Sequence, residues 1–377
     1  MSGIYLHIPF CKQACYYCDF HFSTSLKKKN QVIEAIQKEL VLRKNEFKNS
    51  EVETIYFGGG TPSLLSLKEL EAVLTTIYKN YSVCNNPEIT LEANPDDLTL
   101  TKIKQLEKSA INRLSIGIQS FFDEDLKLMN RAHNASEAAN CLQDALSYFS
   151  NISIDLIYAI PGMSEARWLQ NITKALNYNI PHISAYALTV EPKTALQAFI
   201  SKGLIPPVDD DVASKHFLLL LEKLEQQDYI HYELSNFGKE GYFSKNNTAY
   251  WQQKEYLGIG PSAHSFNGKE RSWNVANNSI YLKKLKEGVL PSEKEALSLT
   301  DQYNEYVMTG LRTQWGVSLN RIKEKFGITY YKYLLKQAEN YLADNYLYID
   351  EDVIRTSKKG KFLSDGIASD LFLLNLE

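Results

Sequence analysis

Three cysteines near the start of the chain have the spacing of a metal site. Cys11, Cys15 and Cys18 lie within eight residues, in the order C-x3-C-x2-C. Three thiolates cannot close a four-ligand site by themselves, so two completions remain open. In the first, His21 completes a Cys3His structural zinc site. In the second, an iron–sulfur cluster keeps one iron without a protein ligand and therefore open to an exogenous one.

Glycines and polar residues that follow other predicted strands decide between these completions. The run GGGTP (58–62) is a turn whose glycines let the chain pass close to a ligand and expose backbone amides. Glu92, Gln119 and Asp155 lie at or near the ends of three further strands. A structural zinc site needs no such surroundings. An open iron that binds the amino acid end of a cofactor needs backbone donors for its charged groups and carboxylates for its amine and ribose, so the context favours the cluster.

The elements that must position these residues form a repeat. Short β-branched or aromatic runs alternate with amphipathic segments over the first two hundred residues, which is typical of βα units in an α/β protein. Right-handed βα units produce a parallel sheet, either open or curled into an incomplete barrel, and the pattern does not choose between the two. In both cases the carboxyl ends of the strands meet, which predicts one shared site. The six predicted strands span residues 4–8, 54–57, 89–93, 113–118, 152–157 and 182–188.

The remainder of the chain has a different character. A helix is expected from about 210 to 228, followed by an aromatic-rich irregular stretch to about 278 that extends the first domain. Beyond about residue 290, a helical region followed by a hairpin predicts a small winged-helix-like domain. The predicted domains are therefore residues 1–275 and 290–377. In the second, helices are expected at 300–314, 319–326 and 330–345 and strands at 346–349 and 353–356.

Composition limits the class of protein. The 377 residues carry 41 Lys and Arg against 45 Asp and Glu, and residues 276–377 hold 14 of each sign, so the basic footprint of a nucleic-acid reader is missing. No apolar stretch is long enough to span a membrane, and the N-terminus lacks the pattern of a secretory signal, so we expect a cytosolic protein. Five cysteines are an odd number, which favours a metal site over a disulfide framework. We interpret Cys84, in an expected loop, and Cys141, in an expected helix, as structural.

The segment Y-x-H-I-P-F-C-x3-C-x-Y-C (5–18), with GGGTP after the next strand, resembles the radical S-adenosylmethionine (SAM) enzymes. The resemblance is to the branch that contains oxygen-independent coproporphyrinogen III oxidase and the HemW-like haem chaperones. It covers nearly the whole chain and implies a partial (β/α)6 barrel with a C-terminal helical, winged-helix-like domain. The further matching segments are LSIGIQSF (114–121), LMNRAH (128–133), IDLIYAIPG (154–162), ISAYALTVEPKT (183–194) and LGIGPSAHSF (257–266).

The resemblance implies a [4Fe–4S] cluster held by the three cysteines, with SAM bound to the fourth iron and an external one-electron donor. Physical chemistry supports part of the implied pocket, because Glu92 and Asp155 suit ribose hydroxyls or an amine and Arg131 suits a carboxylate. Arg131 could also be merely a solvated surface charge. The residues that the resemblance places around SAM are Tyr5, Gly59, Gly60, Thr61, Glu92, Gln119, Arg131, Asp155 and Ala187.

Two features favour the chaperone side of this branch. The oxidase branch has the pattern C-x3-C-x2-C-x-C, whereas position 20 here is Phe. The oxidase also has an N-terminal extension before its cluster, which does not fit a first cysteine at residue 11. The resemblance therefore implies a protein that binds haem or a porphyrin and delivers haem to acceptor proteins. The alternative is the oxidase itself, which oxidatively decarboxylates two propionates. A nucleic-acid module that uses the wing is a third and disfavoured class.

One motif departs from the chaperone pattern. HemW-like proteins carry H-N-x-x-Y-W, a motif linked to haem, and the aligned segment here begins with Asn246 and ends with Tyr250 and Trp251. An amide is a poor ligand for haem iron, so we expect haem to be held weakly or through another group. His264 is one candidate ligand, and a local hydrogen bond is the alternative role for its ring. Tyr250 and Trp251 could pack on a porphyrin face or fasten the extension to the barrel.

Overall fold

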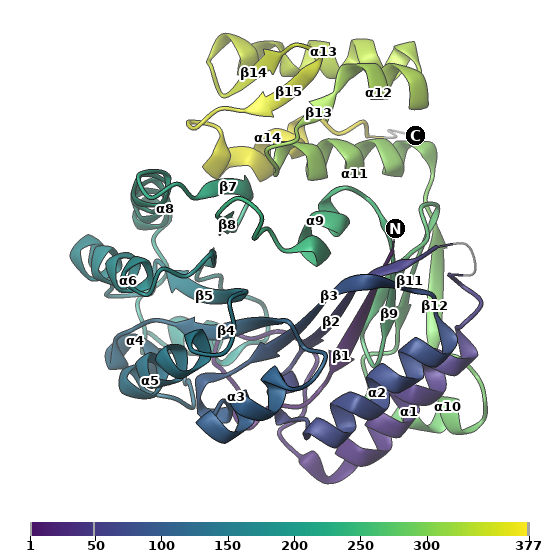
Figure 1. Cartoon of the computed structure of the whole chain (residues 1–377). Helices are drawn as coiled ribbons and strands as arrows, with labels where there is room; N and C mark the ends of the chain where they lie inside the picture. The colour runs from purple at the N-terminus through teal and green to yellow at the C-terminus, as the bar shows by residue number, and fades with distance from the viewer. Residues whose placement is uncertain (1, 48–49, 375–377) are drawn as a thin grey trace.

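The structure, a computed structural model, describes residues 2–47 and 50–374. Its core is a sheet in which six parallel strands follow one another in chain order, as the repeat pattern predicts. The sheet curls into a partial barrel with two free edges, strands β12 and β7 (Figure 1). The six parallel strands are β1 (Ser2–Ile8), β2 (Val52–Gly59), β3 (Val83–Ala93), β4 (Arg113–Gln119), β5 (Ile152–Tyr158) and β6 (His182–Ala187).

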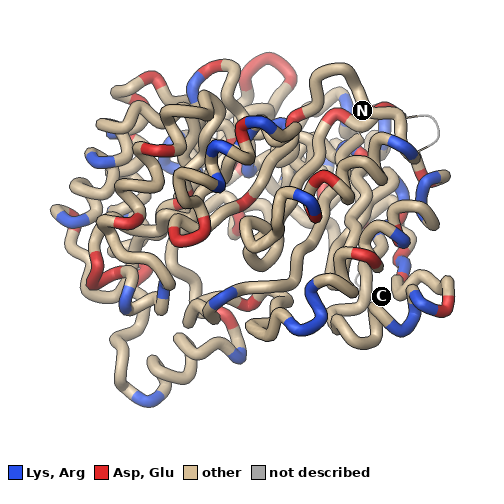
Figure 2. The backbone as a smooth tube through the Cα atoms, turned by 60° about the horizontal axis from the view of Figure 1, so that its bottom comes forward, with Lys and Arg blue, Asp and Glu red and all other residues tan. Residues whose placement is uncertain are grey.

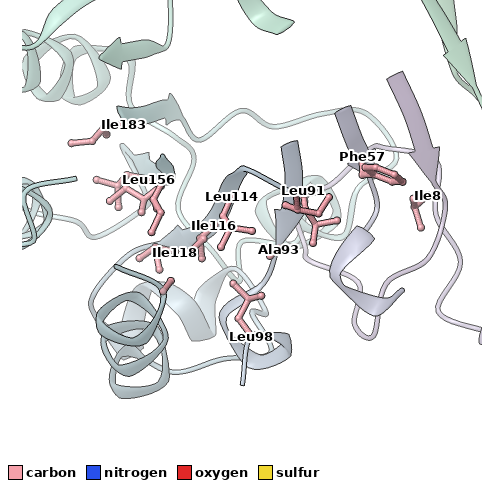
Figure 3. Close-up of a cluster of buried hydrophobic side chains, with 14 of the residues drawn as sticks. Ile8, Phe57, Leu91, Ala93, Leu98, Leu114, Ile116, Ile118, Leu156 and Ile183 are labelled. Atoms are coloured by element: carbon pink, nitrogen blue, oxygen red, sulfur yellow. The ribbon is translucent and has the colours of Figure 1, made fainter. Parts of the chain in front are cut away.

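The two faces of these strands differ in polarity. Apolar side chains at alternate positions point towards the surrounding helices and form the main core; Phe57, Leu91, Ile116 and Leu156 belong to this row (Figure 3). The other alternate positions are buried too but largely polar, and Thr90 and Ser153 are fully buried among them. The strands therefore enclose a polar interior, which is the space where a polar ligand can be held.

Helices connect the strands and cover the outside of the sheet (Figure 1). Their starts carry the expected signals. At the start of α2, for example, Ser66 and Glu69 form a reciprocal capping box. The connecting helices are α1 (Lys29–Leu42), α2 (Leu67–Asn80), α3 (Leu100–Glu107), α4 (Asp123–Leu128), α5 (Ala135–Leu146) and α6 (Glu165–Asn177).

The stretch from 229 to 278 is not irregular, contrary to the sequence-based expectation. It extends the sheet at both edges and contributes the short helix α9 (Lys245–Trp251). The strand next to β1, β9, could not be recognised in the sequence because it contains Gly258 and glycine is rare in strands. A Cβ at this position would lie 1.9 Å from the carbonyl oxygen of His264, so only glycine fits the pairing. The added strands are β7 (Ile230–Glu233), β8 (Asn236–Gly238), β9 (Glu255–Ile259), β10 (His264–Phe266), β11 (Glu270–Asn274) and β12 (Ser292–Ala296).

Two further placements concern the sequence expectations. Cys84 lies on β3 and not in a loop, whereas Cys141 lies on α5 as expected. The expected helix near 210–228 is α8 (Asp210–Glu225), which packs against α6. The remaining helices of the first two hundred and ninety residues are α7 (Ala195–Ser201) and α10 (Asn278–Lys286), the latter against α1.

The C-terminal region has its own hydrophobic core, which runs from Tyr303 to Leu371. It contains the predicted helices and hairpin and one further helix, and in Figure 1 it lies above the barrel, with α9 between them. Because β12 pairs with β11 as an outer strand of the large sheet, we propose that the predicted units 1–275 and 290–377 meet close to residue 297. The elements are α11 (Leu299–Leu311), β13 (Val317–Ser318), α12 (Leu319–Lys325), α13 (Ile328–Ala343), β14 (Leu347–Asp350), β15 (Val353–Thr356) and α14 (Ser364–Asp370).

Charges of both signs are interspersed along the whole backbone (Figure 2). Among the described residues, no helix is long and apolar enough to cross a membrane.

Candidate functional site

The cysteine segment leaves the end of β1 and is tied to the ends of other elements. The backbone N–H of Cys11 donates to the carbonyl of Ser23 at 3.1 Å, and the N–H of Tyr16 donates to the carbonyl of Met129 at 3.1 Å. All five thiols of the chain are free. The segment is therefore held in place by backbone bonds and leaves its three thiols available as ligands.

The three thiols lie close enough to influence one another electrostatically. Burial raises the pKa of Cys18 to about 12 and also raises the pKa of Cys11, and in both cases the neighbouring cysteines add to the rise. In the part of the chain that the structure describes, no three His, Cys, Asp or Glu side chains are already arranged around one metal position. The donor set is nevertheless that of an iron–sulfur cluster, and its binding must release protons from these thiols.

The glycine turn after β2 packs directly against the start of the cysteine segment. The N–H of Gly60 donates to the carbonyl of Ile8 at 2.9 Å, and the N–H of Thr61 donates to that of Phe10 at 2.7 Å. A Cβ on Gly60 would lie 2.6 Å from the oxygen of Phe10. Gly59 has φ +104°, and a Cβ there would lie 2.8 Å from the His7 ring. The glycines thus let β1 and β2 approach so closely that their loops form one wall.

Arg131 is held beside the cysteines and is not a solvated surface charge. One guanidinium nitrogen lies 3.3 Å from Cys15 Sγ, and the other donates to Asn94 Oδ1 at 2.6 Å and to the carbonyl of Gly117 at 3.0 Å. Its Nε is buried without a partner, and among the described residues no carboxylate lies within ion-pair distance. Its neighbours Tyr17 and Cys15 raise its pKa against the effect of burial. A half-buried cation without a carboxylate partner fits an anionic cluster or the carboxylate of a bound cofactor.

Glu92 projects into the polar interior from β3. Its Oε1 accepts a hydrogen bond from the Tyr56 hydroxyl at 2.8 Å, and the ring of Tyr5 stacks on Tyr56 with centroids 6.0 Å apart. Burial raises the pKa of Glu92 to about 7, and the charge of Asp155 raises it further while the Tyr56 hydrogen bond opposes the rise. A carboxyl group in this state can accept a hydrogen bond from a ribose hydroxyl, and its ionised form would be favoured by a cationic amine.

Asp155 enters the same interior from β5. Burial raises its pKa to about 6, although hydrogen bonds from Ser184 and Ser115 and the charges of Arg113 and Arg131 all oppose the rise. The interior therefore contains two carboxyl groups that are costly to ionise without a ligand. This is the arrangement expected of groups that meet a polar or cationic ligand.

The remaining predicted SAM-pocket residues lie around the same strand ends. Gln119 ends β4 with φ 64° and is buried, and Ala187 ends β6. Thr61 accepts a hydrogen bond from Asn94 Nδ2 at 3.2 Å. The polar residues thus come together from the ends of β1 to β6, as parallel topology requires.

Several contributing residues were not assigned to the SAM pocket from the sequence. Asn94 links Thr61 to Arg131, and Tyr56, Arg113 and Ser184 surround the two interior carboxyl groups. Their signal was the alternation of polar and apolar residues in strands that are buried on both faces.

The two histidines of this region have defined partners. His7 Nε2 lies 2.9 Å from the carbonyl oxygen of His21, and burial lowers the pKa of His7 to about 4. His21 Nε2 lies 2.8 Å from Asn278 Oδ1. The neutral His7 ring therefore supports the cysteine segment from β1 and fills the space above Gly59.

A cleft lies between the barrel and the C-terminal domain. It has a volume of about 480 Å³ and is lined by aromatic rings, two arginines, two glutamates and one thioether, with uncharged polar residues between them. Tyr250 packs on Tyr256 with centroids 4.4 Å apart, and the Arg312 guanidinium lies 5.6 Å from the centroid of Trp251. Met308 of α11 lines the cleft from the C-terminal domain. The cleft thus combines aromatic rings with charged groups of both signs, and its Arg271 pairs with its Glu305 at 3.0 Å.

The residues predicted for a haem region divide between two environments. Tyr250 and Trp251 line the cleft, whereas Asn246 and His264 are not among its lining residues. Asn246 is only 3% exposed and accepts a hydrogen bond from Thr54 at 3.2 Å, against the starting ends of the strands. His264 is exposed on β10, where its ring lies 6.1 Å from that of Trp273.

Comparison with known proteins defines the class first. Residues 5–187 match the family model of the radical SAM superfamily, and residues 297–363 match that of the HemN C-terminal domain. The fold is shared with coproporphyrinogen III oxidase (HemN) from Escherichia coli, a radical SAM enzyme. That likeness has a TM-score of 0.85 at 22% identity and covers 98% of this chain and 90% of that one. The chain therefore has the expected partial (β/α)6 barrel of a radical SAM protein.

Full-length relatives then define the particular family. Heme chaperone HemW from Lactococcus lactis is 34% identical, with 99% of this chain and 97% of that protein covered. Heme chaperone HemW from Bacillus subtilis is 30% identical over 97% of this chain and 98% of that protein. The chain belongs to the HemW family of radical SAM proteins.

Proposed function

We propose that this protein is a cytoplasmic haem chaperone that holds a [4Fe–4S] cluster, binds SAM at the strand ends and passes haem to an acceptor protein. The observation that carries the proposal is the similarity, over nearly the whole chain, to relatives named heme chaperone HemW. The interdomain cleft supports it, because aromatic rings suit the face of a porphyrin and arginines suit its propionates.

The cluster and SAM would be bound by residues of the strand-end site. A [4Fe–4S] cluster on Cys11, Cys15 and Cys18 supplies one-electron reduction of the SAM sulfonium when an external donor feeds it. Arg131 would offset the negative charge of the cluster or of the cofactor carboxylate. Glu92 and Asp155 would accept hydrogen bonds from the cofactor amine or ribose. Tyr5 and Gln119 would close the sides of the pocket. The pocket would be lined by Gly59, Gly60, Thr61 and Ala187.

Haem would lie in the interdomain cleft. Tyr250 and Trp251 offer ring faces on its wall, which favours porphyrin packing over a role only in fastening the extension. Asn246 and His264 do not line this cleft, so the proposal assigns the iron to neither of them.

The first test concerns the cluster. Anaerobically reconstituted protein should bind about four irons per chain, the composition of a [4Fe–4S] cluster, and SAM should perturb the paramagnetic spectrum of the reduced protein. Changing Cys11, Cys15 or Cys18 to Ala should abolish the cluster, while Cys84→Ala and Cys141→Ala serve as matched controls. Stoichiometric zinc without iron uptake would contradict the proposal.

The second test concerns haem. Titration of the protein with haem, followed by the Soret band, should show saturable binding that Trp251→Ala weakens. Trp273→Ala is the matched control, because Trp273 lies on β11 outside the cleft. Equal loss of affinity in both variants, or no binding by the unaltered protein, would refute this placement.

The oxidase remains the second candidate, since the fold is shared with coproporphyrinogen III oxidase. Phe20, 66% exposed, stands where the oxidase pattern has a fourth cysteine. We therefore expect no oxidation of coproporphyrinogen III above background by the cluster-loaded protein. Sustained, cysteine-dependent turnover in an anaerobic assay would assign the enzyme activity instead.

A further inference from the structure

A small cleft beside the interdomain cleft has the features of an anion site. Its volume is about 110 Å³, and since a water molecule occupies about 30 Å³ of liquid, it has room for a group larger than one water. Residues of the β7–β8 hairpin line one side, and residues of the C-terminal domain line the other. Leu234 and Arg312 line both clefts, so the two cavities adjoin.

Three cations line this small cleft, and two of them already have carboxylate partners. Arg312 forms two hydrogen bonds to Asp365, at 2.6 and 2.8 Å, and Arg355 pairs with Asp350 at 2.6 Å. Lys361 is the third cation, and within residues 2–47 and 50–374 its side chain makes no ion pair or hydrogen bond.

The surroundings of Lys361 do not offset its charge. Its nearest carboxylate influence is Glu225, which is already bridged to Lys358 at 2.7 Å. Burial lowers the pKa of Lys361, and the charge of Lys358 lowers it further while Glu225 opposes the change. The positive charge of the cleft is therefore unbalanced at one position.

Two residues that line this cleft each carry a buried polar atom without a partner. Ser364 is only 2% exposed, yet its Oγ makes no hydrogen bond. His231 uses Nε2 against the carbonyl of Leu234 at 3.1 Å, and its Nδ1 is buried without a partner. Leaving such a group unsatisfied costs roughly 1–3 kcal/mol, so their concentration at one place needs an explanation.

We infer that this cleft binds a single oxyanion group, either a free phosphate or a carboxylate of a molecule that lies in the adjoining interdomain cleft. The oxyanion would accept hydrogen bonds from Lys361 and Ser364. His231 would face it through Nδ1, either as an imidazolium or as an acceptor for a phosphate hydroxyl. Burial lowers the pKa of His231 to about 3, and the charge of Lys361 adds to this effect. A bound anion would offset the charge of Lys361 and so favour the protonated forms of both side chains. The carboxylate source rests on the proposed haem function, whereas the phosphate source does not.

The first arm of the test measures inorganic phosphate binding by calorimetry in chloride buffer at constant ionic strength. The unaltered protein should bind one phosphate, and Lys361→Met should weaken binding at least tenfold. Lys358→Met is the matched control, because it removes a neighbouring lysine that does not line the cleft. Ser364→Ala should weaken phosphate binding and raise the unfolding temperature without phosphate, since it removes an unsatisfied buried hydroxyl.

The second arm compares haem with haem dimethyl ester, which lacks free carboxylates. If a propionate occupies the cleft, Lys361→Met should weaken haem binding severalfold and leave binding of the ester unchanged. If phosphate binding depends on Lys361 and haem binding does not, the occupant is a free phosphate. Absence of haem binding by the unaltered protein would contradict the haem proposal and leave the phosphate arm decisive. Absence of any Lys361-dependent effect on phosphate or haem would overturn the inference.

Discussion

Glu92→Gln should stabilise the ligand-free protein at neutral pH while it removes a group proposed to bind SAM. The carboxyl group has its pKa raised from 4.5 to about 7, mainly by burial. Folding therefore favours the protonated form, and the stability that this provides is present below pH 4.5 and is lost as the pH rises to about 7. The full shift corresponds to about 3 kcal/mol, because each pKa unit is worth 1.36 kcal/mol. Glutamine retains an oxygen that can accept the Tyr56 hydrogen bond.

The assay is urea unfolding of the cluster-free protein and its variant at several pH values between 4.5 and 8. The difference in free energy of unfolding should be near zero at pH 4.5 and approach ~3 kcal/mol, as an upper value, at pH 8. Asp155 is present in both proteins, and only its repulsion with ionised Glu92 contributes to the difference. Glu71→Gln on the exposed face of α2 is the matched control and should show no such trend. A variant that is equally or less stable than the unaltered protein at pH 8 would refute the reasoning that ionised Glu92 is costly.

Three further changes test how the site is held. Gly60→Ala places a Cβ 2.6 Å from the Phe10 carbonyl and should lower the iron content of reconstituted protein severalfold, whereas Gly366→Ala meets no atom within 4 Å and should not. Arg131→Lys replaces a planar guanidinium by a compact ammonium group. It should weaken SAM binding to the cluster-loaded protein about tenfold, or about 1.4 kcal/mol, in an equilibrium binding assay. Unchanged affinity would contradict the position assigned to Arg131. Asn246→His removes the buried hydrogen bond that the Asn246 side chain accepts from Thr54 and should lower the free energy of unfolding by about 1–3 kcal/mol without shifting the Soret band, and a shifted band would show that position 246 reaches the haem iron.

Much of the barrel could be predicted from the sequence because its signals are local. Each parallel strand is a short β-branched run, and each connection carries helical periodicity, so the order β1 to β6 follows from chain order and handedness. The same rule predicts that the cysteine segment, the GGGTP turn, Glu92, Gln119 and Asp155 share one end of the sheet.

The extension of the sheet could not be predicted in this way. Strand β9 contains Gly258, which has no strand propensity, and it pairs with β1 more than two hundred residues earlier. Glycine is required there only because another backbone lies too close for a Cβ, and a close approach between distant segments leaves no periodic signal.

By itself the sequence determined the parallel βα order, the cysteine spacing and the meeting of polar residues at the strand ends, since periodicity, spacing and handedness are properties of neighbouring residues. Only the tertiary structure decided that Arg131 lies half-buried beside Cys15 and that Asn246 packs against the strand starts. It also decided that Lys361 has no ion-pair partner in the described part of the chain. These properties depend on which distant atoms exclude water from a side chain and which of them offer it a partner. A charged or polar residue looks the same in the chain whether it meets solvent, a carboxylate or an unsatisfied interior, so its role is decided by packing.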